Sequence, residues 1–150
     1  MTSDTIEREI FIMSTIDHVW SLVSRVGFWV GDDLRFDMEA REGELVVIDT
    51  TNYGSFPVQV TRLDAPRYAA YRWASAFPGA TPTEDNSTLV EFTLTERDGG
   101  VVVRLKESGF ANLTADAAVR DAAHADNVGG WAQQLDRLRS AAEAQGAAVS

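Results

Sequence analysis

The 150-residue sequence contains no cysteine, which excludes disulfide bonds, thiolate catalysis and zinc sites built on cysteine. Basic residues are also few, because 13 lysine and arginine residues stand against 23 aspartate and glutamate residues, for a formal net charge of −10. Binding to nucleic acid or to anionic lipid requires clusters of basic side chains that face phosphates. We therefore expect neither nucleic acid nor a lipid surface as a partner.

Long apolar runs are missing as well. The longest uninterrupted runs are 10–13 and 45–48, far below the roughly 20 residues that a transmembrane helix needs. The segment 1–7 has no basic stretch followed by an apolar one, so no secretory signal is predicted. We expect no membrane insertion and a cytoplasmic location. Abundant alanine, together with arginine at all but one of the basic positions, is typical of a bacterial protein.

The composition itself is that of an ordinary globular domain. Hydrophobic residues make up 45% of the sequence and charged residues 24%, a balance that supports a packed core. The length suits one domain, which we expect to span 1–150 with an ordered core over about 5–143. The tail 145–150 is predicted to fray.

The first part of the chain alternates between two periodicities. Apolar and polar residues alternate over 5–12, which predicts a strand. Ser14 and Asp17 resemble a helix-capping box, and the apolar spacing over 16–23 predicts a short amphipathic helix behind it. A second short helix or turn is predicted over 25–30.

From residue 34 to residue 107 the period is two, which predicts about six antiparallel strands. Strands are expected at 34–39, 44–50 and 56–63 and around Tyr71–Trp73, Val90–Leu94 and Val101–Leu105. Asp64-Ala65-Pro66 and Asp98-Gly99-Gly100 have the residues of tight turns. The longest loop is expected over 77–87.

Alanine dominates from Ala111 onward and favours a long helix. An apolar stripe at helical spacing supports this prediction and consists of Val128, Trp131, Leu135 and Leu138. Gly129 and Gly130 interrupt the helix interior. Glycines at such positions mark a bend, or a place where backbone or ligand comes close.

This order of elements predicts an α+β fold in which one long helix covers one face of a curved sheet. Large aromatic residues converge on that face, namely Phe36, Phe56, Tyr71, Trp73, Phe92 and Trp131. They form either a packed core or the wall of a cavity between sheet and helix. Composition alone favours the packed core, because aromatic stripes usually pack.

Several short motifs occur in an order and spacing that cover 10–138. They are Val19-Trp20, Phe28-Trp29, Tyr71-Arg72-Trp73, the segments 88–94 and 107–110, and Gly130-Trp131 with Leu135 and Leu138. Through them the chain resembles the SRPBCC (START-related, helix-grip) superfamily, and within it the family related to the activator of heat-shock protein 90 ATPase, of the stand-alone bacterial type.

The resemblance implies a helix-grip fold, in which a curved antiparallel sheet of about six or seven strands wraps around a long C-terminal helix. Two short helices follow the first strand. It also implies a deep hydrophobic cavity between sheet and last helix, which reverses the preference for a packed core. It also makes a homodimer plausible. Because branches of the superfamily differ in their chemistry, the fold does not choose among them.

The most informative polar residue is Glu107. It shares strand parity with Val101 and Val103, so it should point inward, where burial of a carboxylate raises its pKa. His124 and Asn127 lie on or beside the buried stripe of the last helix. We hypothesise that Glu107, with His124 or Asn127, forms the polar end of an apolar pocket. Alternatively, Glu107 satisfies backbone donors or a buried arginine, or reaches solvent at the strand end.

The remaining polar residues and motifs do not indicate a catalytic or metal site. His18 is expected on the surface, and its spacing from His124 is not that of a metal site. Asp32-Asp33 and Glu84-Asp85 are read as solvated loop charges. The sequence has no phosphate-binding loop, dinucleotide fingerprint or nucleophile elbow. No catalytic residue is assigned, and no metal or cofactor is expected.

Three functions follow from these observations. The first is binding of a small hydrophobic or aromatic molecule by residues that we expect to line the cavity: Trp20, Trp29, Phe36, Phe56, Tyr71, Trp73, Phe92, Glu107, Asn127 and Trp131. The second is an enzyme of the cyclase or aromatase type in which Glu107 or His124 transfers a proton. The third is a co-chaperone-like protein interaction. The eukaryotic co-chaperone has an additional N-terminal domain, for which 150 residues leave no room, and this counts against the third function. A non-catalytic binding role is favoured.

Overall fold

The structure is a computed structural model that describes residues 4–25, 29–30, 40–50, 54–77 and 79–149. Side chains are described as far as residue 144. The strand predicted at 34–39 lies outside these residues, together with Phe36 and Asp32-Asp33. Most of the helix or turn predicted over 25–30 lies outside them as well.

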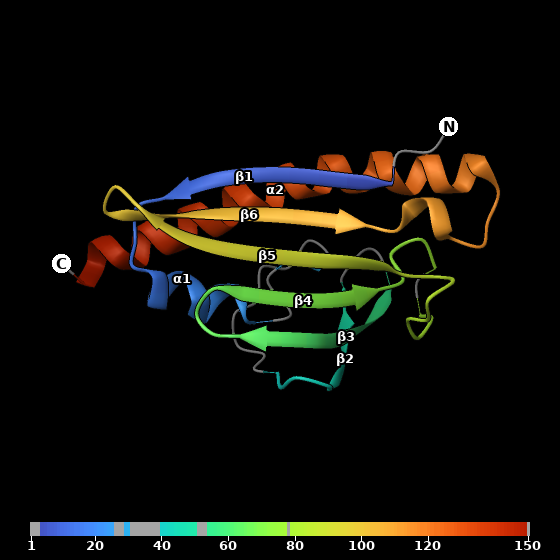
Figure 1. The fold of residues 1–150 in the computed structure, drawn as a ribbon, viewed down its shortest axis with the longest axis horizontal. Helices are drawn as coiled ribbons and strands as arrows, with labels where there is room; N and C mark the ends of the chain where they lie inside the picture. Colours follow the sequence, from blue (N-terminus) through green and yellow to red (C-terminus); the bar gives the residue numbers. More distant parts are fainter. Residues whose placement is uncertain (1–3, 26–28, 31–39, 51–53, 78, 150) are drawn as a thin grey trace.

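The described residues form one six-stranded antiparallel sheet in the order β1-β6-β5-β4-β3-β2. Its strands are β1 (Thr5–Ile12), β2 (Leu45–Asp49), β3 (Ser55–Asp64), β4 (Tyr68–Trp73), β5 (Thr88–Arg97) and β6 (Gly100–Ser108). The predicted positions are confirmed to within a few residues, and so is the α+β class. The first strand, β1, lies at one edge of the sheet and pairs with the last strand, β6 (Figure 1).

The turn between β5 and β6 explains why this hairpin is tight. Asp98 and Gly99 form a two-residue connection with φ angles of 50° and 82°. Positive φ at both positions matches the right-handed twist of the strands, and Asp-Gly tolerates it best. The register that follows pairs Val90 with Glu107 and Phe92 with Leu105. The inward parity predicted for β6 is confirmed, because Val101, Val103, Leu105 and Glu107 are all fully buried.

Helix α1 (Ile16–Val23) begins one residue later than the predicted cap implies. Its N-cap is Thr15, whose hydroxyl accepts a hydrogen bond from the backbone N–H of His18 at 3.2 Å. The prediction of Ser14 as the cap was therefore wrong, because Thr15 has the extended backbone that an N-cap requires. His18 is half-buried rather than exposed, since its Nε2 atom is enclosed and has no hydrogen-bond partner among the residues described.

A 3₁₀ turn, η2 (Phe110–Asn112), leads into the long helix α2 (Ala117–Val149). The helix continues past 145, where the sequence predicted fraying. Its predicted stripe faces the sheet, with Trp131, Leu135 and Leu138 buried. Gly129 and Gly130 do not interrupt it.

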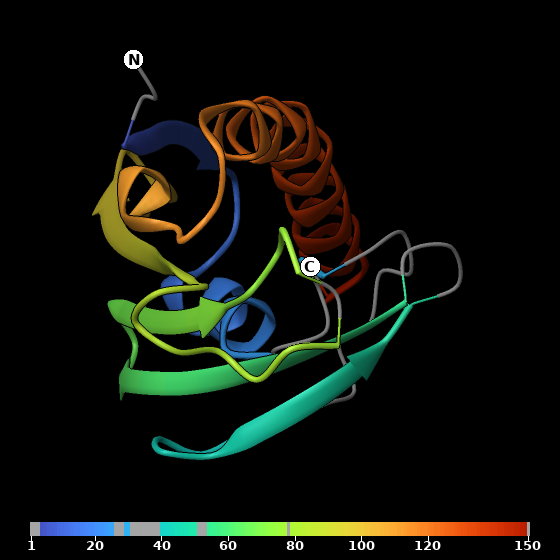
Figure 2. The same cartoon turned by 90° about the vertical axis from the view of Figure 1, so that its right-hand side faces the viewer.

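Both helices lie on the same face of the sheet (Figures 1 and 2). Helix α2 runs beside β1 and β6, and the sheet curves away from it toward β2 (Figure 2). Between them, apolar side chains from every strand and from both helices form one core. This is the helix-grip arrangement. None of the described helices is long and apolar enough to cross a membrane.

Candidate functional site

Glu107 is the centre of a buried polar cluster that joins the sheet to α2. Its Oε2 atom accepts from Trp73 Nε1 at 2.9 Å and is hydrogen-bonded to the hydroxyl of Thr88 at 2.5 Å. Its Oε1 atom accepts from Trp131 Nε1 at 2.7 Å. The side-chain nitrogen Nδ2 of Asn127 donates to both Oε1 and Oε2 of Glu107, each at 3.1 Å. Glu107 is fully buried, and all its partners in this cluster are side chains.

The strand register and the helical repeat explain how these residues meet. Trp73 of β4 pairs with Thr88 of β5, and Glu107 of β6 lies diagonally beyond Thr88 on the same face. Asn127 and Trp131 are four residues apart, so both project from one face of α2. The cluster therefore draws on three neighbouring strands and on one turn of the helix that covers them.

Burial raises the pKa of Glu107 above its ordinary value of 4.5, and the hydrogen bonds from Thr88, Trp131, Trp73 and Asn127 lower it only in part. The cluster can also hold the protonated acid. A protonated Glu107 would donate to the hydroxyl oxygen of Thr88, which can accept, while its two oxygens still accept from the indoles. Both protonation states thus find partners in the same geometry.

An aromatic groove opens next to this cluster, between α2 and the end of β4. We use this name for a pocket of about 870 Å³. Its apolar wall consists of the rings of Trp29, Phe56, Trp73 and Trp131, together with small side chains of α2. Its lining residues are completed by polar groups, which include Ser75, Asp126, Asn127, Gln134 and Arg137.

The four aromatic rings of the groove pack against one another. The ring centroids of Trp29 and Trp73 are 4.9 Å apart in an edge-to-face arrangement at 86°. Those of Trp29 and Trp131 are 5.5 Å apart at 33°, and those of Phe56 and Trp73 are 5.5 Å apart at 55°. Aromatic pairs in such geometry add about 0.5–1.5 kcal/mol each beyond the burial of their area. These contacts therefore favour the arrangement of rings that forms the wall.

The two glycines of α2 also line the groove. Apart from the local helix, a Cβ atom added to Gly129 or Gly130 would meet none of the described residues within 4 Å. Of the two interpretations made from the sequence, close approach of the backbone to a ligand stays a prediction. Packing against a neighbour within the described part of the chain does not account for the glycines, since an added Cβ would contact none of those residues.

The structure divides the predicted site residues into three groups. Trp29, Phe56, Trp73, Asn127 and Trp131 line the aromatic groove. Tyr71, Phe92 and Glu107 are fully buried behind it. The third group is Trp20, which lines a different pocket near β2, and Phe36, which lies outside the described residues. Tyr71 belongs to the core, where its hydroxyl donates to the carbonyl oxygen of Val23 at 3.0 Å.

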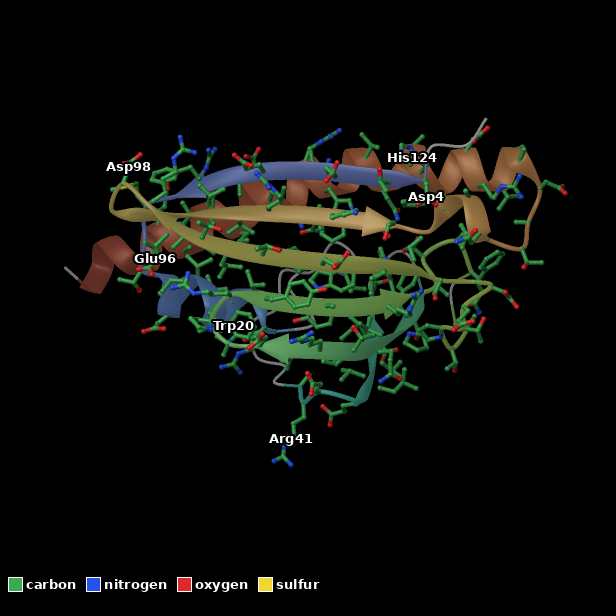
Figure 3. The ribbon with its side chains drawn as sticks, in the orientation of Figure 1. Asp4, Trp20, Arg41, Glu96, Asp98 and His124 are labelled. Carbon is green, nitrogen blue, oxygen red and sulfur yellow. The ribbon has the colours of Figure 1, made fainter. Side chains whose placement is uncertain are left out.

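His124 is not brought to Glu107. Its Nε2 atom lies 3.0 Å from the carbonyl oxygen of Thr5, and its ring packs edge-on against Phe110. Figure 3 shows His124 beside the start of β1, near Asp4, and Trp20 away from it on α1. Among the described residues, no group of three or more His, Asp or Glu side chains is placed to hold a metal ion.

The sequence reasoning missed two partners of the cluster. Thr88 shares strand parity with Val90 and Phe92, and that parity could have identified it as an inward hydroxyl. Ser75 accepts from the side-chain amide of Asn127 at 3.1 Å, but it lies two residues beyond the end of β4 at Trp73, so no periodicity marks it. It is a contact made by the tertiary structure.

The chain was compared with known protein families and structures. The family model described as "Activator of Hsp90 ATPase homolog 1-like protein" matches residues 15–143. The search of curated proteins finds no match.

Several solved structures have a similar fold. The Aha1 dimer from Colwellia psychrerythraea is 20% identical with a TM-score of 0.69, over 94% of this chain and 97% of that one. Protein BH1534 from Bacillus halodurans is 24% identical with a TM-score of 0.66, over 95% and 100%. DynU16, a putative protein in the dynemicin biosynthetic locus, is 20% identical with a TM-score of 0.68. That match covers 92% of this chain, which spans about half of DynU16 (46%).

Proposed function

The chain belongs to the family of Activator of Hsp90 ATPase homolog 1-like proteins, and we propose that it binds a small hydrophobic or aromatic molecule in the aromatic groove. The observation that carries this proposal is the wall of Trp29, Phe56, Trp73 and Trp131 around a volume of about 870 Å³. Binding sites for small molecules have such volumes and combine apolar walls with a few polar groups.

The role of Glu107 in this proposal is to position the wall. Its carboxyl group holds the indoles of Trp73 and Trp131 and the amide of Asn127 by hydrogen bonds. It does not itself line the groove, so a ligand would contact those three residues instead. Glu107 therefore fixes their orientation and acts on the ligand only through them.

A binding role fits this geometry better than the proton-transfer alternative. A general acid or base must come within hydrogen-bond reach of its substrate. Glu107 is enclosed by its partners, and His124 is engaged with the backbone of β1. Neither residue lines the aromatic groove. Catalysis by either one would require the cluster or the helix contact to rearrange first.

The structural relatives are compatible with this proposal. One of them, DynU16, is described as a putative protein in a biosynthetic locus, a setting in which a small-molecule ligand is expected. Another is described as a dimer. A homodimer of this chain stays a prediction, to be checked by native mass spectrometry.

The proposal is tested by titrating the purified protein with N-phenyl-1-naphthylamine, a neutral aromatic probe that fluoresces when it leaves water. The blocking variant is Gly130→Leu, whose side chain would extend into the groove. The matched control is Ala132→Leu, which adds a side chain to an exposed position of α2 outside the groove. We expect saturable binding by the wild type and Ala132→Leu, and its loss in Gly130→Leu. Equal binding by all three proteins would contradict the proposal.

A further inference from the structure

The carboxyl group of Glu107 lies fully buried between the sheet and α2 without a countercharge. The described side chains that pair or hydrogen-bond with it are all uncharged. They are its register partners Ile6 of β1 and Val90 of β5, and its hydrogen-bond partners Trp73, Thr88, Asn127 and Trp131. Burial without an opposite charge disfavours the ionised form of a carboxyl group.

The titratable residues nearest to Glu107 along β6 and α2 are directed elsewhere. Lys106 precedes it on β6 and is exposed on the opposite face of the sheet. Asp126 precedes Asn127 on α2 and is exposed. The Nε2 atom of His124 lies 3.0 Å from the carbonyl oxygen of Thr5, and the neutral ring keeps this bond by carrying its proton on Nε2. Among the described residues, only neutral donors therefore support an ionised Glu107.

The same carboxyl group fastens the middle of α2 to the sheet. It accepts hydrogen bonds from Trp131 and Asn127 on the helix, and it is bound on the sheet side to Trp73 and Thr88. Two other polar contacts hold α2 further along its length. They join His124 to the carbonyl oxygen of Thr5 and Glu143 to the backbone N–H of Met13. A change in the charge of Glu107 therefore acts on the stretch of α2 that contains Asn127 and Trp131.

Proton linkage gives this effect its direction. While α2 lies on the sheet, burial raises the pKa of Glu107 above its ordinary value of 4.5. When the middle of α2 separates from the sheet, water reaches the carboxyl group and its pKa returns toward the ordinary value. Local opening then releases a proton. The equilibrium constant for opening therefore rises with pH from the ordinary pKa up to the raised one, and is constant above it.

We propose that Glu107 is a pH-dependent latch, which holds the middle of α2 on the sheet while its carboxyl group is protonated and releases it when the group ionises. This device goes beyond the proposed function, because it concerns the movement of α2 whether or not a ligand is present. The released stretch carries Asn127, Gly130 and Trp131, which line the aromatic groove. The latch therefore makes access to the groove from the side of α2 increase with pH.

The test is native-state hydrogen exchange of the backbone amides of 127–131 in the wild type, Glu107→Gln and Asp121→Asn. Asp121→Asn is the matched control, since it removes an exposed carboxylate of α2 outside the groove. The protection factor compares each rate with that of a free peptide at the same pH. From about pH 5 to about pH 8 it should fall by up to about tenfold per pH unit in the wild type and in Asp121→Asn, as for one released proton. It should not change with pH in Glu107→Gln.

Two measurements on the wild type keep the latch testable even if Glu107→Gln does not fold. The side-chain ¹³C signal of Glu107 follows its ionisation, and protection at 127–131 should fall only up to the pH at which this signal has finished shifting. The amides of Val103 and Leu105, in the centre of the sheet, should stay more protected because they exchange through global unfolding.

Three results would overturn the latch and leave the proposed function in place. The first is equal protection at 127–131 and in the centre of β6, which would mean that α2 does not open locally. The second is a loss of protection that continues after Glu107 has ionised. The third is the same pH dependence in Glu107→Gln as in the wild type, which would assign the effect to another group.

Discussion

The buried carboxyl group of Glu107 offers the sharpest test of the site's architecture, through the variant Glu107→Gln. Glutamine has nearly the same shape, but only one of its two terminal atoms can accept a hydrogen bond. Oε1 serves Trp131 and Oε2 serves Trp73, and both indoles can only donate. Whichever way the glutamine amide turns, one buried indole N–H loses its acceptor and meets an N–H group instead.

The expected loss in the free energy of unfolding follows from this one unsatisfied indole N–H. Leaving one buried donor unsatisfied costs about 1–3 kcal/mol, so Glu107→Gln should lower the free energy of unfolding by about that amount. The contacts of Asn127 and Thr88 adapt more easily, because Asn127 reaches both oxygens and the hydroxyl of Thr88 can rotate. The loss is a large share of the roughly 5–15 kcal/mol that stabilises a typical domain.

The pH dependence has a definite sign. Burial raises the pKa of Glu107 in the folded protein above 4.5, so the native state holds this proton more tightly than the unfolded chain does. Its contribution to stability is present below the unfolded pKa and is lost as pH rises through the folded pKa. Glutamine does not titrate. The penalty of Glu107→Gln should therefore be larger at about pH 5 than at about pH 8.

Urea unfolding followed by tryptophan fluorescence measures both effects. The control is Glu96→Gln, near the end of β5 (Figure 3). It removes an exposed carboxylate that pairs with Arg67 and should change the stability by less than about 1 kcal/mol. A Glu107→Gln variant as stable as the wild type would refute the idea that the carboxyl group satisfies two indoles. A penalty that grows with pH would refute the claim that burial outweighs the hydrogen bonds in setting the pKa.

Three further predictions concern the fold. Thr15→Ala should lower the free energy of unfolding by about 0.5–2 kcal/mol, and Ser14→Ala by less than about 0.5 kcal/mol, because Thr15 caps α1; the reverse order in urea unfolding would restore the sequence-predicted cap. Gly130→Ala should raise stability by about 0.4–1 kcal/mol, because the added Cβ meets no described residue within 4 Å outside the local helix; a lower midpoint of thermal unfolding would contradict this reasoning. Leu138→Ala should cost about 2–5 kcal/mol in urea unfolding and exposed Val47→Ala less than about 0.5 kcal/mol; equal losses would disprove the packing assigned to α2.

Much of the candidate site follows from parity and helical spacing. The alternation along β6 identified Glu107 as inward, and the spacing of the last helix placed Asn127 near Trp131. The same reasoning placed His124 on the buried stripe, where its ring instead reaches the backbone of β1 at Thr5. A position on a helix face defines a direction but not a partner, since the partner depends on which strand lies beneath it.

The sequence by itself determined the elements, because hydrophobic periodicity and turn residues are local properties. It predicted the alternating strands, the Asp98-Gly99 hairpin and the apolar stripe of the long helix. It also determined that aromatic side chains share one face. The sequence could not predict which of these rings belong to the core and which line the groove. Periodicity assigns the same inward direction to a ring that packs and to a ring that lines a pocket.

Only the tertiary structure decided that division. The sheet curves away from α2, so Tyr71 and Phe92 pack behind the wall while Trp73 and Trp131 meet the open volume. It also decided that Glu107 turns to the indoles rather than to solvent or to a basic residue. The physical reason is that burial and hydrogen-bond partners depend on how distant segments approach one another, which no local pattern encodes.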